Sequence, residues 1–488
     1  MFQSSTPTLL ASLGFGAEGC KKHLVSLGQI PNGHDVWNDR VVKNTSGGDP
    51  FRCEWATNHH SDGYPSESMT QASNHLRTTR LDNGLQIITE RNPSQRSASV
   101  IWLVPGGSAC DPLDRGDGWA TLLSEFLMRG SGELDSRGFS DAMDRIGMRR
   151  SVSADTYHQH ISATLAGSDL RLGIDFLVDL VLKPRFPDDA LTPVKSLCLQ
   201  ELSGIEDDPS SFAAVRLDEI RYPSPFHRHG LGIQQHIEAT TPDDLRGHWA
   251  DVARPSGSIL AIAGDVDHDR VVEQLSLKLV DWTGTGPTPA PVGKPVGGTL
   301  RIERDTSQVH LGIGLDGPIA ADPDHLAFRT AVGVLGGGSS SRLFLDIRER
   351  RGLAYSVSAR YSEGFALGAC TISAGTTPER IAETLERIDA VLESFDDGPT
   401  DEEVGRIAVG LRAGGLMQQE HGPSRARQLA LDVFRRGTAR STEAILSEFD
   451  GIDADDVRRV VSERMGPAWR SAAIRCLLGP ASAIAGPA

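Results

Sequence analysis

A long internal duplication constrains the fold of this chain more than any other feature of its sequence. The first copy, SVIWLVPGGSACDP, alternates apolar residues on one face of a strand and then turns through two glycines. The second copy, VHLGIGLDGPIAADP, repeats this pattern. Trp102 and Ile313 are 211 positions apart, and so are Asp111 and Asp322. The sequence therefore predicts two homologous halves.

Each half is predicted to contain both strands and helices. An apolar helical pattern follows each copy, and each half ends in a strand that runs into glycine, SILAIAGD and AAIRCLLG. This order predicts an α+β fold of two tandem homologous α/β sandwich domains, with helices packed on an antiparallel sheet. Residues 284–298, GTGPTPAPVGKPVGG, are mostly Gly and Pro and favour neither helix nor strand. We expect domains at 75–283 and 299–488, joined by a hinge linker at 284–298.

The first 74 residues differ from the rest, because no apolar period persists in them. Regular patterning begins at HLRTTRLDNGLQIITER, where two strands flank an Asp82-Asn83-Gly84 turn. Met69 lies shortly before it. Two interpretations stay open: residues 1–74 are a real, mostly disordered extension, or the start is mis-annotated and the protein begins at Met69.

Composition excludes several classes of function. No run of eighteen apolar residues occurs, which predicts no transmembrane helix, and no basic stretch precedes the first apolar patch, which argues against a secretory signal. We therefore expect a cytoplasmic protein. The six dispersed cysteines form no CxxC pair and are expected to be reduced. The net charge of −16 argues against nucleic-acid binding and favours basic peptides as partners.

The stretch GDGWATLLSEFLMRG, directly after the first copy, predicts a buried helix. Asp114 or Asp117 can cap its start, and Gly130 or Gly132 can end it. Its apolar residues recur at helical spacing: Trp119, Leu122, Leu123, Phe126 and Leu127. Alone, this pattern indicates a core helix and no function.

Several blocks together resemble the insulinase/pitrilysin (inverzincin) family of zinc peptidases. They are LDNGLQIITE, VIWLVPGGSACDP, the buried helix, EDDPSSFAAVRLDEI and LGGGSSSRLFLDIRERRGLAYSVSARYSEGFALGACTISAG. The resemblance spans residues 75–488 and is closer to the half-length branch that includes the mitochondrial processing peptidases. It implies that this chain forms half of a clam-like peptidase chamber.

Active members of the family carry His-x-x-Glu-His on the first helix, where two imidazoles bind zinc and the carboxylate acts as general base. The matching positions here are Thr121, Ser124 and Glu125. A Thr hydroxyl is a poor zinc ligand, and Ser cannot accept the proton that a carboxylate accepts. The resemblance therefore implies a degenerate zinc site, no metal or other cofactor in this chain, and no activity of the chain alone.

Glu201 occupies the place of the family's third zinc ligand. Val194, Leu197, Cys198, Glu201 and Ile205 fall on one helical stripe. We therefore expect the Glu201 carboxylate to face the apolar side and to be paired with an Arg or another hydrogen-bond donor, because an unpaired buried carboxylate is costly. Weak binding of a hard cation by Glu125 and Glu201 is the less favoured alternative.

Two histidine pairs, His158 with His160 and His227 with His229, are the other candidates for zinc ligands. A His-x-His pair on a strand can ligate zinc, but no partner carboxylate or Cys is close in sequence, and exposed or hydrogen-bonded histidines are the simpler interpretation. The stretch RSVSADTYHQHISATL instead matches the family's edge strand, to which a peptide substrate adds by backbone pairing. The expected substrate-binding residues are Ser151, Val152, Ser153 and Ala154.

The second half keeps a pair that the family uses. In DIRERRGLAYSV, Arg348 and Tyr355 match the Arg and Tyr that reach toward the zinc site of the closed chamber and hold the substrate carbonyl or its oxyanion. The alternative without the family is a surface Arg and a core Tyr.

Loss of the zinc ligands together with retention of this pair predicts the non-catalytic subunit of a heterodimeric zinc metalloendopeptidase. Its partner would be a homologous, zinc-binding chain with an intact His-x-x-Glu-His motif, and its substrates would be peptides or small unfolded proteins. The chain is expected to bind neither nucleic acid nor membrane. A structural scaffold subunit and a peptide-binding maturation factor without turnover are the alternatives. A self-sufficient peptidase with a displaced site is the least favoured.

Overall fold

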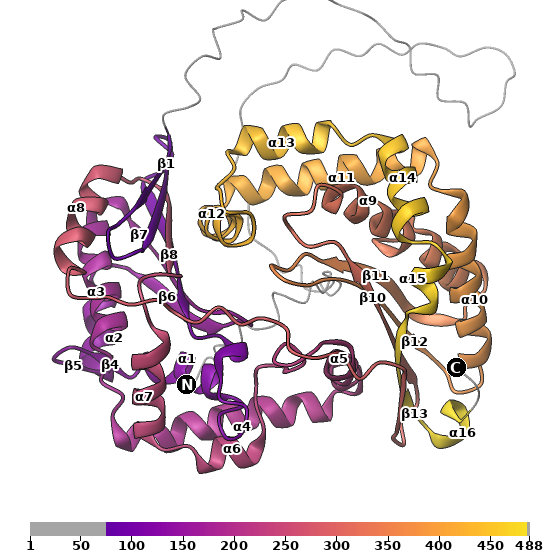
Figure 1. Ribbon diagram of the computed structural model, residues 1–488, viewed down its shortest axis with the longest axis horizontal. Coiled ribbons are helices and arrows are strands. Elements are labelled where there is room, and N and C mark those ends of the chain that lie inside the picture. The colour runs from indigo at the N-terminus through magenta and orange to yellow at the C-terminus, as the bar shows by residue number, and fades with distance from the viewer. Residues whose placement is uncertain (1–74, 486–488) are drawn as a thin grey trace, which may run out of the picture. The chain divides into compact units, whose positions relative to one another are not determined.

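The structure is a computed structural model that describes residues 75–485, all of which belong to one compact unit, Ser68–Ala488. The expectations for residues 1–74 concern a segment outside this range. Two mixed sheets dominate the unit, one from each half of the sequence (Figure 1). Among the described helices, none combines the length and the apolar character needed to cross a bilayer.

The N-terminal sheet has the strand order β1-β2-β8-β3-β7-β6. Its strands are β1 Leu76–Arg80, β2 Gln86–Arg91, β3 Ser97–Pro105, β6 Arg149–Ala154, β7 His158–Ala166 and β8 Ile259–Gly264. Neighbours pair antiparallel except β2 and β8, which are parallel. The closing strand β8 thus lies between the first hairpin and β3. A two-stranded ribbon, β4 Gly130–Ser131 and β5 Leu134–Asp135, is separate from this sheet.

The C-terminal sheet repeats this plan with the order β11-β12-β10-β13-β9. Its strands are β9 Thr299–Glu303, β10 Val309–Gly317, β11 Ala354–Ser362, β12 Gly368–Thr376 and β13 Ile474–Gly479. Only β9 and β13 pair in parallel. Trp102 and Ile313 both lie on the strand that pairs with the closing strand of its sheet. This confirms the predicted tandem repeat, with a parallel pair in each otherwise antiparallel sheet.

The helices also follow the repeat. The first half contains α1 Trp119–Leu127, α2 Ser136–Arg145, α3 Leu170–Leu182, α4 Leu191–Asp207, α5 Pro209–Arg221, α6 Gln234–Ala239, α7 Pro242–Val252 and α8 His268–Lys278. The second half contains α9 His325–Gly336, the π-helical segment η5 Phe344–Arg350, α10 Ile381–Ser394, α11 Asp401–Glu420, α12 Gly422–Arg436, α13 Thr442–Asp450, α14 Ala454–Arg464, α15 Pro467–Ser471 and α16 Ala481–Ile484. The consecutive pair α4 and α5 corresponds to α11 and α12.

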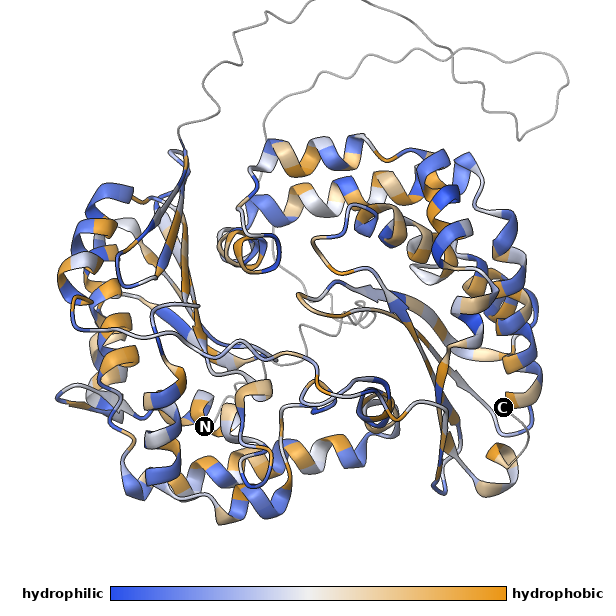
Figure 2. Cartoon of the chain, viewed as in Figure 1, coloured by the Kyte–Doolittle hydropathy of each residue, from blue (hydrophilic) through white to orange (hydrophobic). Residues whose placement is uncertain are grey.

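Both faces of the central strand β3 are buried. Trp102 and its alternate neighbours join the core that contains α1, whereas Ile101 and Leu103 contact α12. A strand covered on both faces is a run of apolar residues, as β8 is along its whole length and β3 is from residue 100 to residue 105. Figure 2 shows the corresponding hydrophobic colour along these strands and hydrophilic residues on the outer helix faces.

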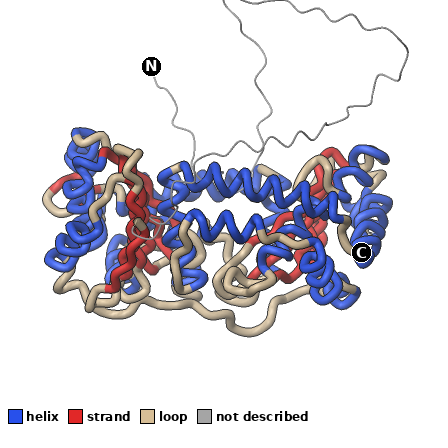
Figure 3. The backbone as a smooth tube through the Cα atoms, turned by 90° about the horizontal axis from the view of Figure 1, so that it is seen from above, coloured by secondary structure: helices blue, strands red, loops and turns tan. Residues whose placement is uncertain are grey.

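The helices α5 and α12 are exchanged between the halves. Helix α12 of the second half packs on β3 and β8, and α5 of the first half packs on β10 and β13 (Figure 1). Figure 3 shows helices lying between the two groups of strands. The sequence did not reveal this exchange, because an apolar stripe predicts burial without saying which sheet provides the contact.

Glycines make room for α5 on the second sheet. Gly312 and Gly314 stand where the first copy has Ile101 and Leu103, and a Cβ added at Gly314 would lie 2.8 Å from Cδ of Arg221. The buried Arg221 guanidinium donates to Thr371 Oγ1 at 2.8 Å, to the Cys370 carbonyl at 3.2 Å and to the Leu315 carbonyl. The backbone of α5 can therefore approach the strand closely.

Residues 284–298 contain neither helix nor strand beyond two isolated bridges. The backbone N–H of Val292 donates to the Ser224 carbonyl at 2.7 Å, and that of Gly297 donates to the Ile220 carbonyl at 2.8 Å. The later part of this Gly- and Pro-rich segment is thus attached to the end of α5 and the loop that follows it, whereas its first residues bond to Ser256. A second feature of the sequence, the Asp82-Asn83-Gly84 turn, joins β1 and β2 as an antiparallel hairpin, with Gly84 at φ +97°.

Candidate functional site

Helix α1 carries the residues that match the zinc motif, and its start is fixed by Asp111. The Asp111 carboxylate accepts from the backbone N–H groups of Gly118 and Ala120, both at 3.2 Å. The cap is thus provided by Asp111, and the expectation that Asp114 or Asp117 caps this helix is wrong. The reason is Gly118, which precedes the helix at φ +106° and turns the chain so that the earlier Asp111 reaches these amides.

The first two motif positions are occupied by hydroxyls that bond to neighbouring protein groups. Thr121 Oγ1 donates to the Gly230 carbonyl at 2.7 Å. The buried Ser124 hydroxyl lies 2.8 Å from Oε1 of Gln159 and 3.1 Å from the Ala120 carbonyl. Gln159, on β7, was not predicted from the sequence. Its side chain links helix α1 to the sheet at the position of the family's general base.

The two carboxylates of the degenerate site lie near each other on α1 and α4. Glu125 makes a 3.6 Å ion pair with Arg129 one helical turn later. Partial desolvation and then the nearby charge of Glu125 raise the pKa of the Glu201 carboxyl. Burial, followed by the charges of Glu201 and Glu125, raises the pKa of the Cys198 thiol to about 12.

Glu201 itself is exposed, and no Arg or other donor in the described range pairs with it. The expectation that it faces the apolar side is therefore wrong. Val194 and Cys198 are buried as predicted, but Leu197 is 43% exposed and the later turns of α4 carry no fully buried residue. The apolar stripe of α4 therefore extends further along the sequence than the part of the helix that is packed in the core.

The residues present do not fit a zinc ion. Zinc sites use three or four His, Cys, Asp or Glu donors, and the described residues contain no group of three such side chains placed to hold a metal. At this site two hydroxyls are already hydrogen-bonded, and the Cys198 thiol near the two carboxylates has its pKa raised to about 12, which disfavours the thiolate that would bind a metal.

Of the two histidines on β7, His160 is committed to other partners, whereas Nδ1 of the buried His158 has no hydrogen-bond partner among the described residues. His160 Nε2 lies 2.7 Å from Oδ2 of Asp155, and its Nδ1 lies 3.0 Å from Nη1 of Arg427 on α12. Because an arginine can only donate, Nδ1 accepts and Nε2 carries the proton. Asp155 is the nearby carboxylate that the sequence analysis did not find, although it lies in the same hairpin. Burial lowers the pKa of the neighbouring His158 to about 4.

The other pair lies in the loop before α6 and also forms no metal site. His229 Nδ1 accepts from the backbone N–H of Leu231 at 3.3 Å, and burial lowers the pKa of His229. His227 Nδ1 is buried and has no hydrogen-bond partner within residues 75–485.

The expected substrate-binding residues lie on an edge strand. Ser151, Val152, Ser153 and Ala154 belong to β6, which among the described strands pairs only with β7, and Val152 is opposite Ile161. Helix α1 packs beside this strand. The free edge of β6 therefore runs next to the degenerate zinc site and presents unpaired backbone groups.

Arg348 and Tyr355 lie together on the second half. Arg348 is on η5 and Tyr355 is on the edge strand β11, and the Arg348 Cζ atom lies 5.4 Å from the centre of the Tyr355 ring. The register of β11 against β12 shifts between Ala354 and Ser356, so Tyr355 is the extra residue of a β-bulge. A bulge re-aims a side chain, and Tyr355 is accordingly 76% exposed.

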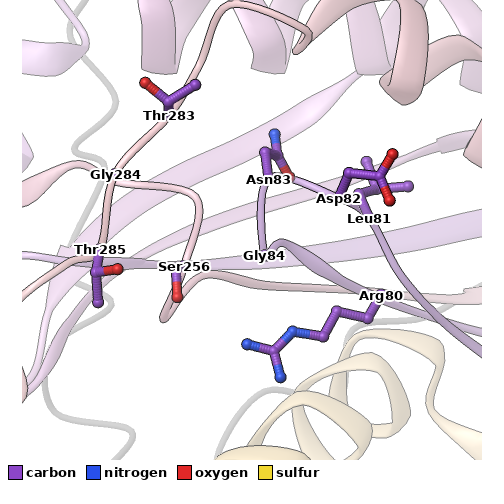
Figure 4. Close-up of a pocket in the computed structure, with 9 residues that line it drawn as sticks. All are labelled: Arg80, Leu81, Asp82, Asn83, Gly84, Ser256, Thr283, Gly284 and Thr285. Carbon is purple, nitrogen blue, oxygen red and sulfur yellow. The ribbon is translucent and has the colours of Figure 1, made fainter.

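The two sets of predicted site residues are not brought together within this chain. The described contacts of Thr121, Ser124 and Glu125 are all within the first half, and those of Arg348 and Tyr355 are within the second. A pocket of about 420 Å³ lies elsewhere, between the Asp82–Gly84 turn and the residues around Gly284, and none of the predicted site residues lines it (Figure 4).

Comparison with family models finds two matches. The model described as insulinase (peptidase family M16) matches residues 86–225, and the model described as peptidase M16 inactive domain matches residues 239–410. The two matches lie mainly in the first and second halves of the repeat, respectively.

Similar proteins are described as uncharacterized zinc proteases. One from Mycobacterium bovis is 31% identical over 405 residues, which cover 80% of this chain and 92% of that protein. Another from Streptomyces coelicolor is 29% identical over 411 residues, which cover 80% of this chain and 87% of that protein.

Solved structures share the fold. The peptidase M16 inactive domain from Pseudomonas fluorescens has a TM-score of 0.76 at 20% identity and covers 83% of this chain and 98% of its own. A protease from Helicobacter pylori has a TM-score of 0.75 at 19% identity and covers 83% of this chain and 99% of its own.

Proposed function

Because this chain belongs to the insulinase family, peptidase family M16, we propose that it is the non-catalytic, substrate-positioning subunit of a two-chain zinc endopeptidase. A homologous partner with an intact His-x-x-Glu-His helix supplies the zinc and the general base. This chain supplies Arg348 and Tyr355 in trans. One observation carries the proposal: the zinc motif is lost at every position, whereas the Arg and Tyr are both present, adjacent and exposed.

The chemistry of α1 supports a role without metal catalysis. The Ser124 hydroxyl cannot accept the proton that a carboxylate general base would accept, and it is hydrogen-bonded to Gln159. Thr121 is likewise bonded to a backbone carbonyl. Helix α1 thus still packs against β6, but neither hydroxyl can act as the general base that activates a water molecule for attack.

The Arg348 and Tyr355 side chains are suited to contact a substrate. Neither makes a hydrogen bond to another described residue, and no described carboxylate pairs with Arg348. Their N–H and O–H donors are therefore available for a peptide carbonyl or the oxyanion formed from it, which two preorganised donors stabilise.

The edge of β6 supports a peptide as the ligand. An extended peptide can add to a free edge through backbone hydrogen bonds without requiring one particular sequence. Ser151 to Ala154 would provide these bonds. Substrates would be peptides or small unfolded proteins, because only an extended chain presents its backbone in this way.

The test is an assay of a fluorogenic peptide with this chain, with a homologue that carries the intact motif, and with both. We expect activity and zinc only where the homologue is present, and a rate at least about tenfold higher in the mixture. In the mixture, Arg348→Ala and Tyr355→Phe should each lower kcat about tenfold or more.

Arg350→Ala is the matched control, because Arg350 is also exposed on η5 and should leave the rate unchanged. Stoichiometric zinc with activity in this chain alone would refute the proposal. A mixture whose rate is insensitive to both Arg348→Ala and Tyr355→Phe would instead favour a scaffold or peptide-binding subunit without turnover.

A further inference from the structure

The Arg348 guanidinium contacts two aromatic rings and forms no ion pair with a residue that the structure describes. Its Cζ atom lies 4.9 Å from the centre of the Phe344 ring and 5.4 Å from the centre of the Tyr355 ring. Both distances are within the range of cation–π attraction, which leaves the N–H donors of the guanidinium unused. An ion pair would instead occupy these donors and neutralise the charge.

The nearby carboxylate is occupied by other arginines. Asp346, two positions before Arg348, accepts from Arg351 Nε at 3.3 Å and from Arg387 Nε at 3.1 Å. Asp346 therefore fixes η5 to α10 and leaves Arg348 without an acidic partner.

The two rings differ in how firmly they are fixed. Phe344 is half-buried and packs against the C-terminal core, whereas Tyr355 is 76% exposed on its bulge. Phe344 and Arg348 are four positions apart on one π-helical segment, so their side chains lie on neighbouring turns. Phe344 is thus the rigid surface on which the guanidinium rests.

We propose that Phe344 is a positioning residue that holds the Arg348 guanidinium beside Tyr355 with its donors free for a ligand. This rests on the proposed function for its catalytic consequence, but the contact itself can be tested on the chain alone. Holding the guanidinium in this way requires an aromatic ring at position 344, but a hydroxyl added to that ring should make no difference.

The first experiment measures the reaction of phenylglyoxal with individual arginines of the full-length chain by peptide mass spectrometry. In Phe344→Leu, Arg348 should react about threefold faster, the change expected from loss of one exposed cation–π contact. Phe344→Tyr should retain the slow rate. Arg350 is the internal control and should react equally in all three proteins. An unchanged Arg348 rate in Phe344→Leu, or an equal acceleration of Arg350, would overturn the proposal.

The second experiment is a double-mutant cycle in the mixture with the motif-bearing homologue. Phe344→Leu should lower kcat about threefold with KM unchanged, and it should have no further effect when Arg348 is already Ala. If Phe344→Leu slows both backgrounds equally, its role is structural and the proposal fails. If Arg348→Ala itself has no effect, the proposed function fails, while the phenylglyoxal rates still decide whether Phe344 holds Arg348.

Discussion

Ser124 Oγ lies 2.8 Å from Oε1 of Gln159, which connects helix α1 to strand β7. Gln159 is fully buried, and its amide nitrogen donates to the Gly106 carbonyl at 2.9 Å and the Ala120 carbonyl at 2.8 Å. At the position where the family places a catalytic carboxylate, this chain has a closed hydrogen-bond network.

Removing this network should destabilise the protein in two steps. Ser124→Ala leaves one acceptor unpaired and should lower the free energy of unfolding by about 1 kcal/mol. Gln159→Leu removes the donor to the buried Gly106 carbonyl and the acceptor of the Ser124 hydroxyl, and it should cost about 2 to 3 kcal/mol. Urea unfolding followed by circular dichroism measures both values. Equal, small losses would show that Gln159 does not link the helix to the sheet.

The exchanged helix α12 depends on an ion pair between the halves. Arg425 binds both carboxylate oxygens of Glu90, at 2.5 and 2.7 Å, and only 3% of its side chain is exposed. Arg425→Ala leaves Glu90 without its cation and should cost about 3 kcal/mol. Arg412→Ala, which breaks an exposed pair with Asp450, should cost less than about 1 kcal/mol. A similar cost for the two variants in chemical unfolding would contradict the importance of this contact.

Acid should weaken the start of α11 through Glu403. Its carboxylate accepts from Arg342 at 2.8 Å and closes the capping box with Thr400, and the Arg342 hydrogen bond is the largest cause that lowers the pKa of Glu403 to about 2. Because the folded value is below the ordinary value of 4.5, the stabilisation is complete above pH 4.5 and is lost as the pH falls toward 2.

Glu403→Gln should therefore lower the free energy of unfolding by about 2 kcal/mol at pH 7 and by much less near pH 2. Melting curves across this pH range test the difference. Glu402→Gln is the control, because Glu402 is exposed and pairs only with Arg406 on the next turn. A Glu403→Gln deficit that does not shrink in acid would contradict this assignment.

If a peptide substrate adds to the edge of β6, only every second residue of the peptide forms backbone hydrogen bonds with that strand. In a series of peptides N-methylated at one residue each, methylation at alternate positions should raise KM in the mixed complex about fivefold, because each removes one backbone hydrogen bond. Methylation at the intervening positions should have little effect. A series without this alternation would exclude backbone pairing as the binding mode.

The sequence by itself determined the duplication, the two mixed α/β halves and the loss of the zinc motif. The repeat is visible because apolar residues alternate in the same way along the strands that contain Trp102 and Ile313. This alternation indicates which residues of each strand face a core. The loss of the motif needs no tertiary information, since Thr121 and Ser124 carry neither an imidazole nor a carboxylate in any conformation.

Only the tertiary structure decided which surfaces meet. An apolar stripe predicts burial but not its partner, so the exchange of α5 and α12 was not predicted, and Glu201 proved to be exposed although its stripe is apolar. Gln159 reaches Ser124, 35 positions earlier, because the packing of α1 on the sheet brings them together. Asp155 reaches His160, five positions later, through the turn between β6 and β7. The exposure of Tyr355 depends on a bulge, a feature of strand register that the local sequence does not specify.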